Sequence, residues 1–378
     1  MPDGQPTMGV EEEFLLVNPR TGHASACAER VLARYRHHGP LPDGVRVHRE
    51  LRLTQIEAAS GVCTTADGLR HQLTTARRVL AGAAAAEDCA LLATGTPIGP
   101  GPAAPPPASD GRYAEIDATY GAVVADYEAC GCHVHVGVPD PDTAVAVVNH
   151  VGRWLPTLLA LSANAPFDHG RDTGYHSWRM VQQARFPGSG VAPHLRDHAE
   201  YRRAVETLVD CGALVDPDQT FWLARPSGRF PTVEFRVADT ALTVDHALLQ
   251  ALLSRALVRR ALADLDRGRV AEPVSPQVAA AAVWAAARHG LTGQLVDVAG
   301  QTRRPAWALV EELLTHVRDA LDANGDLAEV QSLVAVLRAE GTGSVQQRAA
   351  AGRGSPEAVV GWLTALTVPA GRGKLRTG

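Results

Sequence analysis

The chain has little net charge of either sign and no block of basic residues. It contains 36 lysines and arginines against 41 aspartates and glutamates, which gives a formal net charge of −5. Because proteins that bind nucleic acids generally present a strongly basic surface, we expect no nucleic-acid partner. The opening residues, MPDGQPTMGVEEEF, have no charged segment followed by an apolar run. We therefore expect no signal peptide.

Long apolar runs and a dense framework of cysteines are also missing. The alanine-rich stretch 81–90 is interrupted by Glu87 and Asp88 and is too short to cross a bilayer, so we expect no membrane association. The six cysteines are scattered over 378 residues, unlike the dense disulfide framework of a small secreted domain. A reducing cytoplasm is the simplest compartment that fits this composition.

Two common nucleotide-binding motifs are absent. No G-x-x-x-x-G-K-[ST] loop occurs, and no G-x-G-x-x-G leads from a strand into a helix, so a bound nucleotide would need another scaffold. The sequence C-G-C-H-V-H at 130–135 resembles part of a zinc cluster. Zinc sites normally combine C-x₂₋₄-C with a second ligand pair. Since no second pair is evident, structural zinc is the minor alternative.

The sequence does contain polar residues that alternate with apolar ones on four predicted strands, at 9–17, 51–58, 131–138 and 232–238. In a strand, residues i and i+2 point to the same face. The pairs that share a face in this way are Glu11 with Glu13, His133 with His135, and Glu234 with Arg236; the second strand contributes Glu57, with Gln55 as a further candidate.

Each of these pairs has a plainer explanation when it is taken alone. Two glutamates on an edge strand can face water, Glu and Arg two residues apart can form a structural ion pair, and a single histidine is often a hydrogen-bonded core residue. Their joint occurrence instead predicts a sheet whose polar face lines a cavity. Crowded carboxylates repel unless a cation lies between them, and Mg²⁺ prefers oxygen ligands. Arginine binds phosphate through paired hydrogen bonds. The pattern therefore predicts two or more Mg²⁺ ions bridged by phosphates.

Helical patterns separate the strands and dominate the C-terminal part. We predict helices at 66–86, 142–163 with a bend at Pro156, 198–211 and 244–266, and only helices from about 276 onward. Strands interrupted by helices, without regular βαβ alternation, predict an α+β fold with a largely antiparallel sheet. We read the proline-rich segment 97–107 as a loop within one domain that spans 1–368, and the basic, glycine-rich residues 369–378 as a disordered tail.

The motifs that carry these residues resemble those of a known family. They are G-V-E-E-E-F-L-L-V, C-G-C-H-V-H-V-G-V-P-D, L-P-T-L-L-A-L-S-A-N-A-P-F, D-T-G-Y-H-S-W-R, R-P-S-G-R-F-P-T-V-E-F-R-V-A-D and G-T-G-S-V-Q-Q-R. Each motif is weak alone, but together they run from about Met8 to Thr367. The chain resembles the carboxylate–amine ligase family, also called glutamate–cysteine ligase type 2.

The resemblance implies a glutamine-synthetase-like fold, whose antiparallel sheet curves into an open funnel with flanking helices. It implies ATP- and Mg²⁺-dependent joining of a carboxylate to an amine through an acyl phosphate, with glutamate and cysteine as reference substrates, in a homodimer. The implied metal ligands are Glu11, Glu13, Glu57, His133 and Glu234. The implied ATP- or substrate-binding residues are Arg112, His135, Arg179, Arg225 and Arg236. Catalytic roles fall to Glu57, Arg179 and Arg236.

Three departures from the family motifs leave the amine acceptor open. Family members commonly carry Gly-Thr-His-Pro where this chain has Gly-Thr-Pro at 95–97, Asp near 223–224 where it has Leu-Ala, and Ser-Pro-Phe where it has Ala-Pro-Phe at 165–167. An acceptor other than cysteine is therefore open. Two other functions also stay open: a phosphotransferase of the guanidino-kinase type on the same fold, and a non-catalytic nucleotide-binding homologue.

Overall fold

A seven-stranded antiparallel sheet organises the first two-thirds of the chain in the computed structural model, which describes residues 5–37, 41, 44–99, 111–352 and 356–368. The strand order is β2-β3-β1-β5-β9-β8, and β4 also pairs with β1. The strands are β1 (Met8–Val17), β2 (Arg46–Arg49), β3 (Gln55–Ala59), β4 (Ala90–Leu92), β5 (Gly131–Gly137), β8 (Ala224–Pro226) and β9 (Thr232–Asp239). The predicted combination of helices with a largely antiparallel sheet is confirmed.

Strand β1 lies inside the sheet, between β3 and β5, and its two faces differ. Glu12 faces the helices, where its carboxylate pairs with the Arg77 guanidinium at 2.6 Å, and neither side chain is more than 1% exposed. Phe14, which has the same parity as Glu12, is fully buried in a hydrophobic cluster on that face. Glu11 and Glu13 point the other way. The alternative of an edge strand with charges facing water is therefore wrong.

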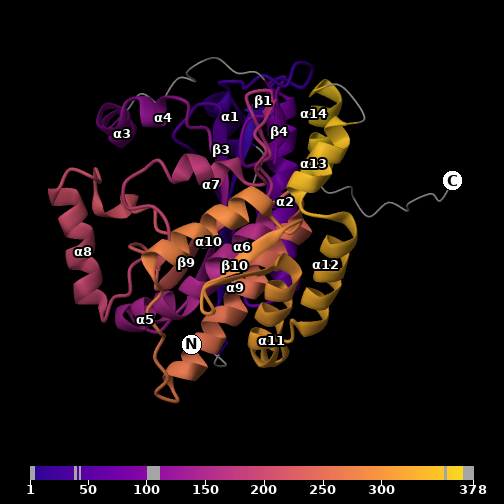
Figure 1. Cartoon of the computed structure of the whole chain (residues 1–378). Coiled ribbons are helices and arrows are strands. Elements are labelled where there is room, and N and C mark those ends of the chain that lie inside the picture. Colours follow the sequence, from indigo (N-terminus) through magenta and orange to yellow (C-terminus); the bar gives the residue numbers. More distant parts are fainter. Residues whose placement is uncertain (1–4, 38–40, 42–43, 100–110, 353–355, 369–378) are drawn as a thin grey trace.

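Helices cover the face of the sheet to which Glu12 belongs. They include α2 (Ala66–Ala85), α5 (Pro141–Val151), α6 (Leu155–Ser162) and α9 (Val244–Leu265). Thr65 and Thr243 begin α2 and α9 by accepting hydrogen bonds from backbone N–H groups in the first turn, which satisfies donors that a helix start leaves unpaired. The central α9 packs against both β1 and β5 (Figure 1). This apolar layer holds the sheet so that its opposite face is free to carry polar groups.

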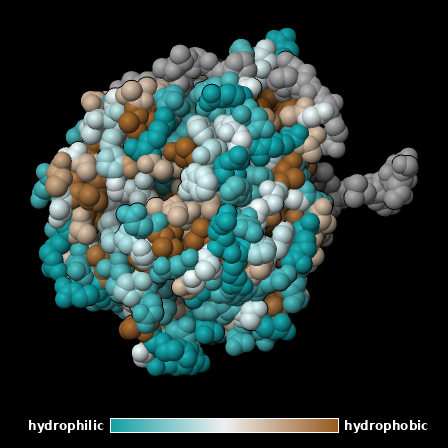
Figure 2. Space-filling view, viewed as in Figure 1, coloured by the Kyte–Doolittle hydropathy of each residue, from teal (hydrophilic) through white to brown (hydrophobic). Residues whose placement is uncertain are grey.

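The predicted helix 142–163 is present but interrupted by a 3₁₀ turn at Gly152–Trp154, next to the proline that was expected to bend it. By length and composition alone, the segment Pro141–Ser162 is apolar enough to cross a membrane, with a mean hydropathy of 1.3. However, 78% of this window is buried inside the structure. On the face shown in Figure 2, hydrophobic patches are small and separated by hydrophilic surface. The burial of Pro141–Ser162 is typical of a core helix.

The C-terminal part corrects one expectation. Its helices are α10 (Pro276–His289), α11 (Ala306–Asn324), α12 (Leu327–Glu340), α13 (Gly343–Ala351) and α14 (Pro356–Thr367), but a hairpin of β10 (Gln294–Asp297) and β11 (Thr302–Pro305) interrupts them. The expectation of helices alone from about 276 is therefore wrong. Leu295 of β10 is fully buried in the same hydrophobic cluster as residues of β5 and β9, so the hairpin closes part of the core. Figure 1 shows α14 beside β4, and α13 packs against α14.

The second predicted strand is shorter than expected. Pairing with β1 begins at Gln55 rather than at residue 51. Arg52 turns inward instead. Its guanidinium contacts the Val124 carbonyl and lies 3.2 Å from Asp117, so side-chain contacts help to hold the segment before β3. The remaining described elements are α1 (Ala28–Arg36), α3 (Arg112–Tyr120), α4 (Ala122–Ala125), β6 (Phe167–Asp168), β7 (Arg171–Asp172), α7 (Trp178–Gln183), α8 (His198–Asp210) and the 3₁₀ turn Pro217–Gln219. The predicted tail 369–378 and most of the proline-rich loop lie outside the described residues.

Candidate active site

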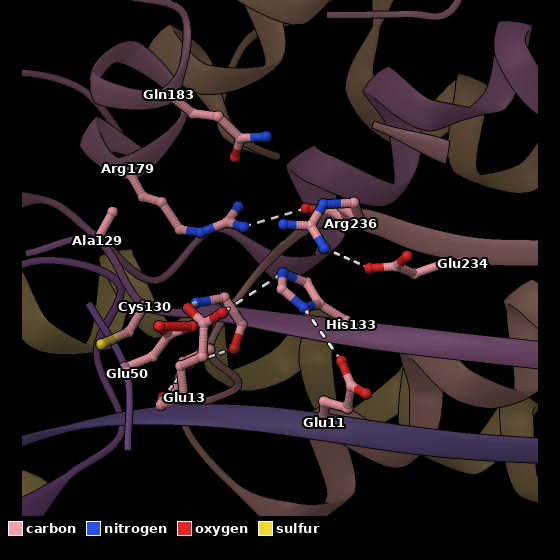
Figure 3. A network of polar contacts seen from close by, with 12 residues as sticks. Glu11, Glu13, Glu50, Ala129, Cys130, His133, Arg179, Gln183, Glu234 and Arg236 are labelled. Carbon is pink, nitrogen blue, oxygen red and sulfur yellow. Dashed lines mark hydrogen bonds and ion pairs between the residues drawn. The ribbon is translucent and has the colours of Figure 1, made fainter. Parts of the chain in front are cut away.

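The polar face of the sheet is the floor of a cavity of about 1080 Å³. Strands β1, β3, β5 and β9 form the floor, and the walls come from β2, α3, α7 and the segment 218–231. Figure 3 shows side chains from β1, β5 and β9 rising toward Arg179 and Gln183, which enter from α7 on the opposite side. The cavity is large enough for a drug-sized ligand or for two smaller ones.

One group of carboxylates lies at the β1–β3 side of the floor. Glu13 and Glu57 are register partners in the β1–β3 ladder, and one oxygen from each lies within 4.8 Å of an oxygen of Glu50. Burial, and then the charges of Glu11 and Glu50, raises the pKa of Glu57 well above its usual value. Burial and the charge of Glu13 raise the pKa of Glu50 to about 7. Three carboxylates this close fit a divalent cation, which would remove their mutual repulsion.

A second group lies toward β9. One ligand atom each from Glu11, His135 and Glu234 falls within the same 4.8 Å limit. Burial alone would raise the pKa of Glu11, but hydrogen bonds with His133 and His135 outweigh it and hold that pKa well below its usual value. The donor set of two carboxylates and one imidazole also fits a divalent cation.

His133 stands between the two groups. Its Nδ1 is 3.5 Å from a Glu11 oxygen, and its Nε2 is 3.6 Å from a Glu13 oxygen (Figure 3). Burial and the nearby Arg236 charge lower the pKa of His133 to about 4, so the ring is neutral at physiological pH. A neutral imidazole can donate a hydrogen bond from one nitrogen and offer the other as an acceptor or ligand.

Three arginines surround these groups. Arg236 pairs with Glu234 of its own strand, and Arg225 Nε donates to the same carboxylate at 2.8 Å. Arg179 Nη2 donates to the Arg236 carbonyl at 3.1 Å. Within the described part of the chain, Arg179 Nε and Nη1 and Arg236 Nε are buried and have no hydrogen-bond partner. Buried donors without partners are costly, so these N–H groups fit an anion held in the cavity.

Local structure explains why Arg179 takes this position. Ser177 caps α7 and its Oγ donates to Asp239 at 2.7 Å, which ties the start of the helix to the end of β9. A Cβ at Gly131 would lie 2.4 Å from Arg179 Nη2, so the C-G-C motif needs glycine at its centre to admit the guanidinium. The Gly131 N–H also donates to Glu13 at 2.6 Å.

The structure brings all of the predicted site residues to one cavity. Its lining includes Glu11, Glu13, Glu57, Arg112, His133, His135, Arg179, Arg225, Glu234 and Arg236. Arg112 lies toward the solvent side of the cavity, since its side chain is 44% exposed and pairs with Asp216. The two histidines lie differently from what the resemblance implies for them. His135 belongs to one of the three-residue groups, whereas His133 lies between the two groups and contacts Glu11 and Glu13.

The sequence interpretation missed Glu50 and the uncharged residues of the walls. Glu50 lies between β2 and β3, in a turn without periodicity, and only the fold brings it to Glu13 and Glu57. Gln183 and an aromatic cluster that includes Tyr127, Phe186 and Phe221 also line the cavity. Their rings contact one another, with centroids 5.0 Å apart for Tyr127 and Phe186. An apolar wall of this kind suits the uncharged part of a substrate.

The residues that depart from the family motifs lie behind the cavity wall. Among the described residues, neither 95–97, 165–167 nor 223–224 belongs to its lining. Gly95 instead accepts a backbone hydrogen bond from Cys130 at 2.9 Å and donates one to Asn164 at 3.0 Å, which supports the start of β5. The described groups that could hold a metal contain no cysteine, and Cys130 and Cys132 are fully buried. The minor zinc alternative therefore has no support.

Comparisons with known proteins agree with this site. The family model described as "Glutamate-cysteine ligase family 2(GCS2)" matches residues 7–360. A relative from Saccharopolyspora erythraea, named "Putative glutamate--cysteine ligase 2-2", is 52% identical over 381 residues, which cover 99% of this chain and 95% of the relative.

Two solved structures share the fold. A glutamate–cysteine ligase from Francisella tularensis in complex with AMP matches with a TM-score of 0.70 at 13% identity, covering 97% of this chain and 89% of the other. A bifunctional glutathione synthetase from Pasteurella multocida matches with a TM-score of 0.67 at 14% identity, covering 97% of this chain and 52% of the other. These likenesses confirm the predicted fold class. The chain belongs to glutamate–cysteine ligase family 2.

Proposed function

We propose that the protein is an ATP- and Mg²⁺-dependent ligase that joins the γ-carboxylate of glutamate to an amine, with cysteine as the reference acceptor. The observation that carries this proposal is the pair of metal-type groups on one sheet face, with buried arginine donors beside them. Family membership supports a carboxylate–amine ligase. The AMP named with the Francisella structure supports the use of an adenine nucleotide.

Each metal-type group would hold one Mg²⁺. Glu13, Glu50 and Glu57 supply three carboxylates for one ion. Glu11, Glu234 and His135 supply the ligands for the other. Bound Mg²⁺ would neutralise phosphate oxygens, which is the main requirement of phosphoryl transfer. Arg236 and Arg225, held by the Glu234 carboxylate, would keep positive charge at the same end of the cavity.

The reaction follows from the weakness of a carboxylate as an electrophile. A carboxylate oxygen of glutamate attacks the γ-phosphorus of ATP, the bond to ADP breaks, and an acyl phosphate forms. The neutral amine then attacks the acyl carbon, and phosphate leaves with the electron pair of the C–O bond. Unpaired donors on Arg179 and Arg236 would orient the anions in line for the first step. The nitrogen gives up one proton as the amide forms.

The proposal extends to the setting of the enzyme. We expect one catalytic domain over 1–368 and, from the scattered cysteines, a cytoplasmic location. The family resemblance implies a homodimer. A single hydrophobic cluster runs from β5 and β9 through α9 to α11 and α12, which supports one folding unit. Sedimentation velocity tests the dimer.

The test of the function is ADP release with ATP, Mg²⁺ and glutamate, screened against cysteine and a panel of small amines. The expected result is ADP release that depends on one amine, together with a product mass equal to glutamate plus that amine minus water. A phosphorylated acceptor without an amide would instead identify a phosphotransferase. ATP binding without turnover across the whole panel would identify a non-catalytic nucleotide-binding protein.

A further inference from the structure

The Gln183 side chain presents an unpaired acceptor to the cavity. Its Nε2 donates to the Phe221 backbone carbonyl at 3.3 Å. Because a carbonyl can only accept, this contact fixes the orientation of the amide and leaves Oε1 on the other side. Gln183 is 2% exposed, and Oε1 has no hydrogen-bond partner among the described residues. Figure 3 shows this oxygen on the side of Arg179.

Arg179, four residues earlier on the chain, has buried N–H donors without hydrogen-bond partners among the described residues. These donors are on Nε and Nη1; Nη1 lies 3.9 Å from the buried Asp239 carboxylate, and Nη2 donates to the Arg236 carbonyl. Gln183 and Arg179 both line the cavity, yet neither satisfies the other. A buried acceptor and buried donors that face one space but do not bond each other fit a ligand that carries both an anion and an N–H donor.

This combination separates the candidate ligands. A phosphate or a simple carboxylate offers acceptors to Arg179 but would leave Gln183 Oε1 facing further acceptors. The α-carboxylate and α-ammonium of an amino acid satisfy both residues. We infer that Gln183 is a substrate-specificity residue that accepts a hydrogen bond from the α-ammonium of the carboxylate donor, while Arg179 binds its α-carboxylate. This inference rests on the proposed function for the identity of the donor as glutamate.

Gln55 is the rival acceptor. It also lines the cavity, its Nε2 donates to the Ala129 carbonyl at 2.9 Å, and its Oε1 is unpaired among the described residues. However, Gln55 lies on β3 two residues before Glu57, beside the carboxylates proposed to hold Mg²⁺. An ammonium there would compete with that cation. Gln183 reaches the cavity from α7, on the opposite side.

The test compares glutamate with glutarate, which lacks only the α-ammonium, by calorimetric binding in the presence of Mg²⁺ and ADP. The variants are Gln183→Met, Gln55→Met and the matched control Gln182→Met. Gln182 is 3% exposed, lies on the same helix, donates to Asp168 at 3.2 Å and is outside the cavity lining. Melting temperatures check that each variant folds.

The expected result is that the wild type and Gln182→Met prefer glutamate, whereas Gln183→Met loses about 10- to 100-fold of that preference and binds glutarate as before. In turnover, the loss should appear mainly in the KM for glutamate, with the KM for ATP unchanged. A preserved preference in Gln183→Met overturns the inference, as does its loss in Gln55→Met alone or the absence of glutamate binding by the wild type.

The inference and the proposed function can fail separately. If the wild type releases ADP with glutamate and an amine while Gln183→Met keeps the full preference, the ligase proposal stands and the assignment of Gln183 falls. If the preference for glutamate disappears in Gln183→Met but no amine supports ADP release, the amino-acid site stands and the ligase proposal falls.

Discussion

Glu13 of β1 and Glu57 of β3 stand opposite each other in an antiparallel ladder, and both side chains line the same cavity. Carboxylates directly opposite on neighbouring strands destabilise a sheet unless a cation separates them. Burial, together with neighbouring carboxylates, also raises the pKa of Glu57 well above its usual value. Repulsion between the Glu13 and Glu57 carboxylates therefore destabilises the floor of the site, and metal binding would relieve it.

This repulsion predicts opposite effects of Glu57→Gln with and without Mg²⁺. In chelator, the variant should melt at the same temperature as the wild type or a few degrees higher, because an amide removes the cost of holding a titratable carboxyl group among crowded carboxylates. With Mg²⁺, the wild type should gain stability and the variant should gain less. Scanning calorimetry makes the measurement, with the exposed Glu311→Gln as the control. A variant that melts well below the wild type in chelator would contradict this repulsion.

Arg236→Lys should reduce the rate of ADP release by about 100-fold or more while leaving the fold intact. The lysine keeps the charge but loses the planar fork that holds Glu234 and presents a second N–H to the anion. Steady-state ADP release at saturating ATP measures the effect. Arg153→Lys, which alters a pair with Glu312 outside the cavity, is the matched control. Equal rates in both variants would remove Arg236 from the machinery.

Substitution of two neighbouring glutamates on β1 should affect different properties of the protein. Glu12→Gln leaves the Arg77 charge buried without its carboxylate partner and should cost about 3–5 kcal/mol of unfolding free energy. Glu13→Gln should leave stability nearly unchanged and abolish ADP release, because Glu13 faces the cavity. Urea unfolding and ADP release, measured on both variants, check this separation. Loss of stability in Glu13→Gln with full activity would reverse the assignment of the two faces.

His176 should make the protein sensitive to acid. Burial, and then the charge of Arg348, lowers the pKa of His176 to about 4. Because the unfolded chain binds its proton near pH 6.5, the stabilising contribution is present above pH 6.5 and is lost as the pH falls toward 4. The advantage of the wild type over His176→Gln should therefore shrink by about 1–2 kcal/mol across that range. A difference that is independent of pH would contradict this assignment.

Alternation along the strands could be predicted from the sequence because a strand fixes side-chain direction by parity alone. Glu11, Glu13, His133, Glu234 and Arg236 were placed on one face by that rule, and the structure puts them there. Burial of Glu12 opposite Arg77 follows from the same parity. The family motifs added Arg179 and Arg225, whose roles still rest on the resemblance.

The rest of the site could not be read from periodicity. Glu50 sits in the connection between β2 and β3, and only the fold brings it close to Glu57. Gln183 looks like any polar residue of a short helix until its Oε1 is found buried and unpaired. The β10–β11 hairpin was missed because two four-residue strands, joined by a turn with Gln301 at a φ of 51°, leave too short a pattern.

The most direct test of the central claim follows an oxygen atom. Glutamate labelled with ¹⁸O in its γ-carboxylate is incubated with ATP, Mg²⁺ and the amine that supports ADP release, and the released phosphate is examined by mass spectrometry. If the carboxylate is activated as an acyl phosphate, one ¹⁸O atom moves to phosphate for each amide formed. Phosphate without ¹⁸O alongside a labelled amide would contradict the mechanism.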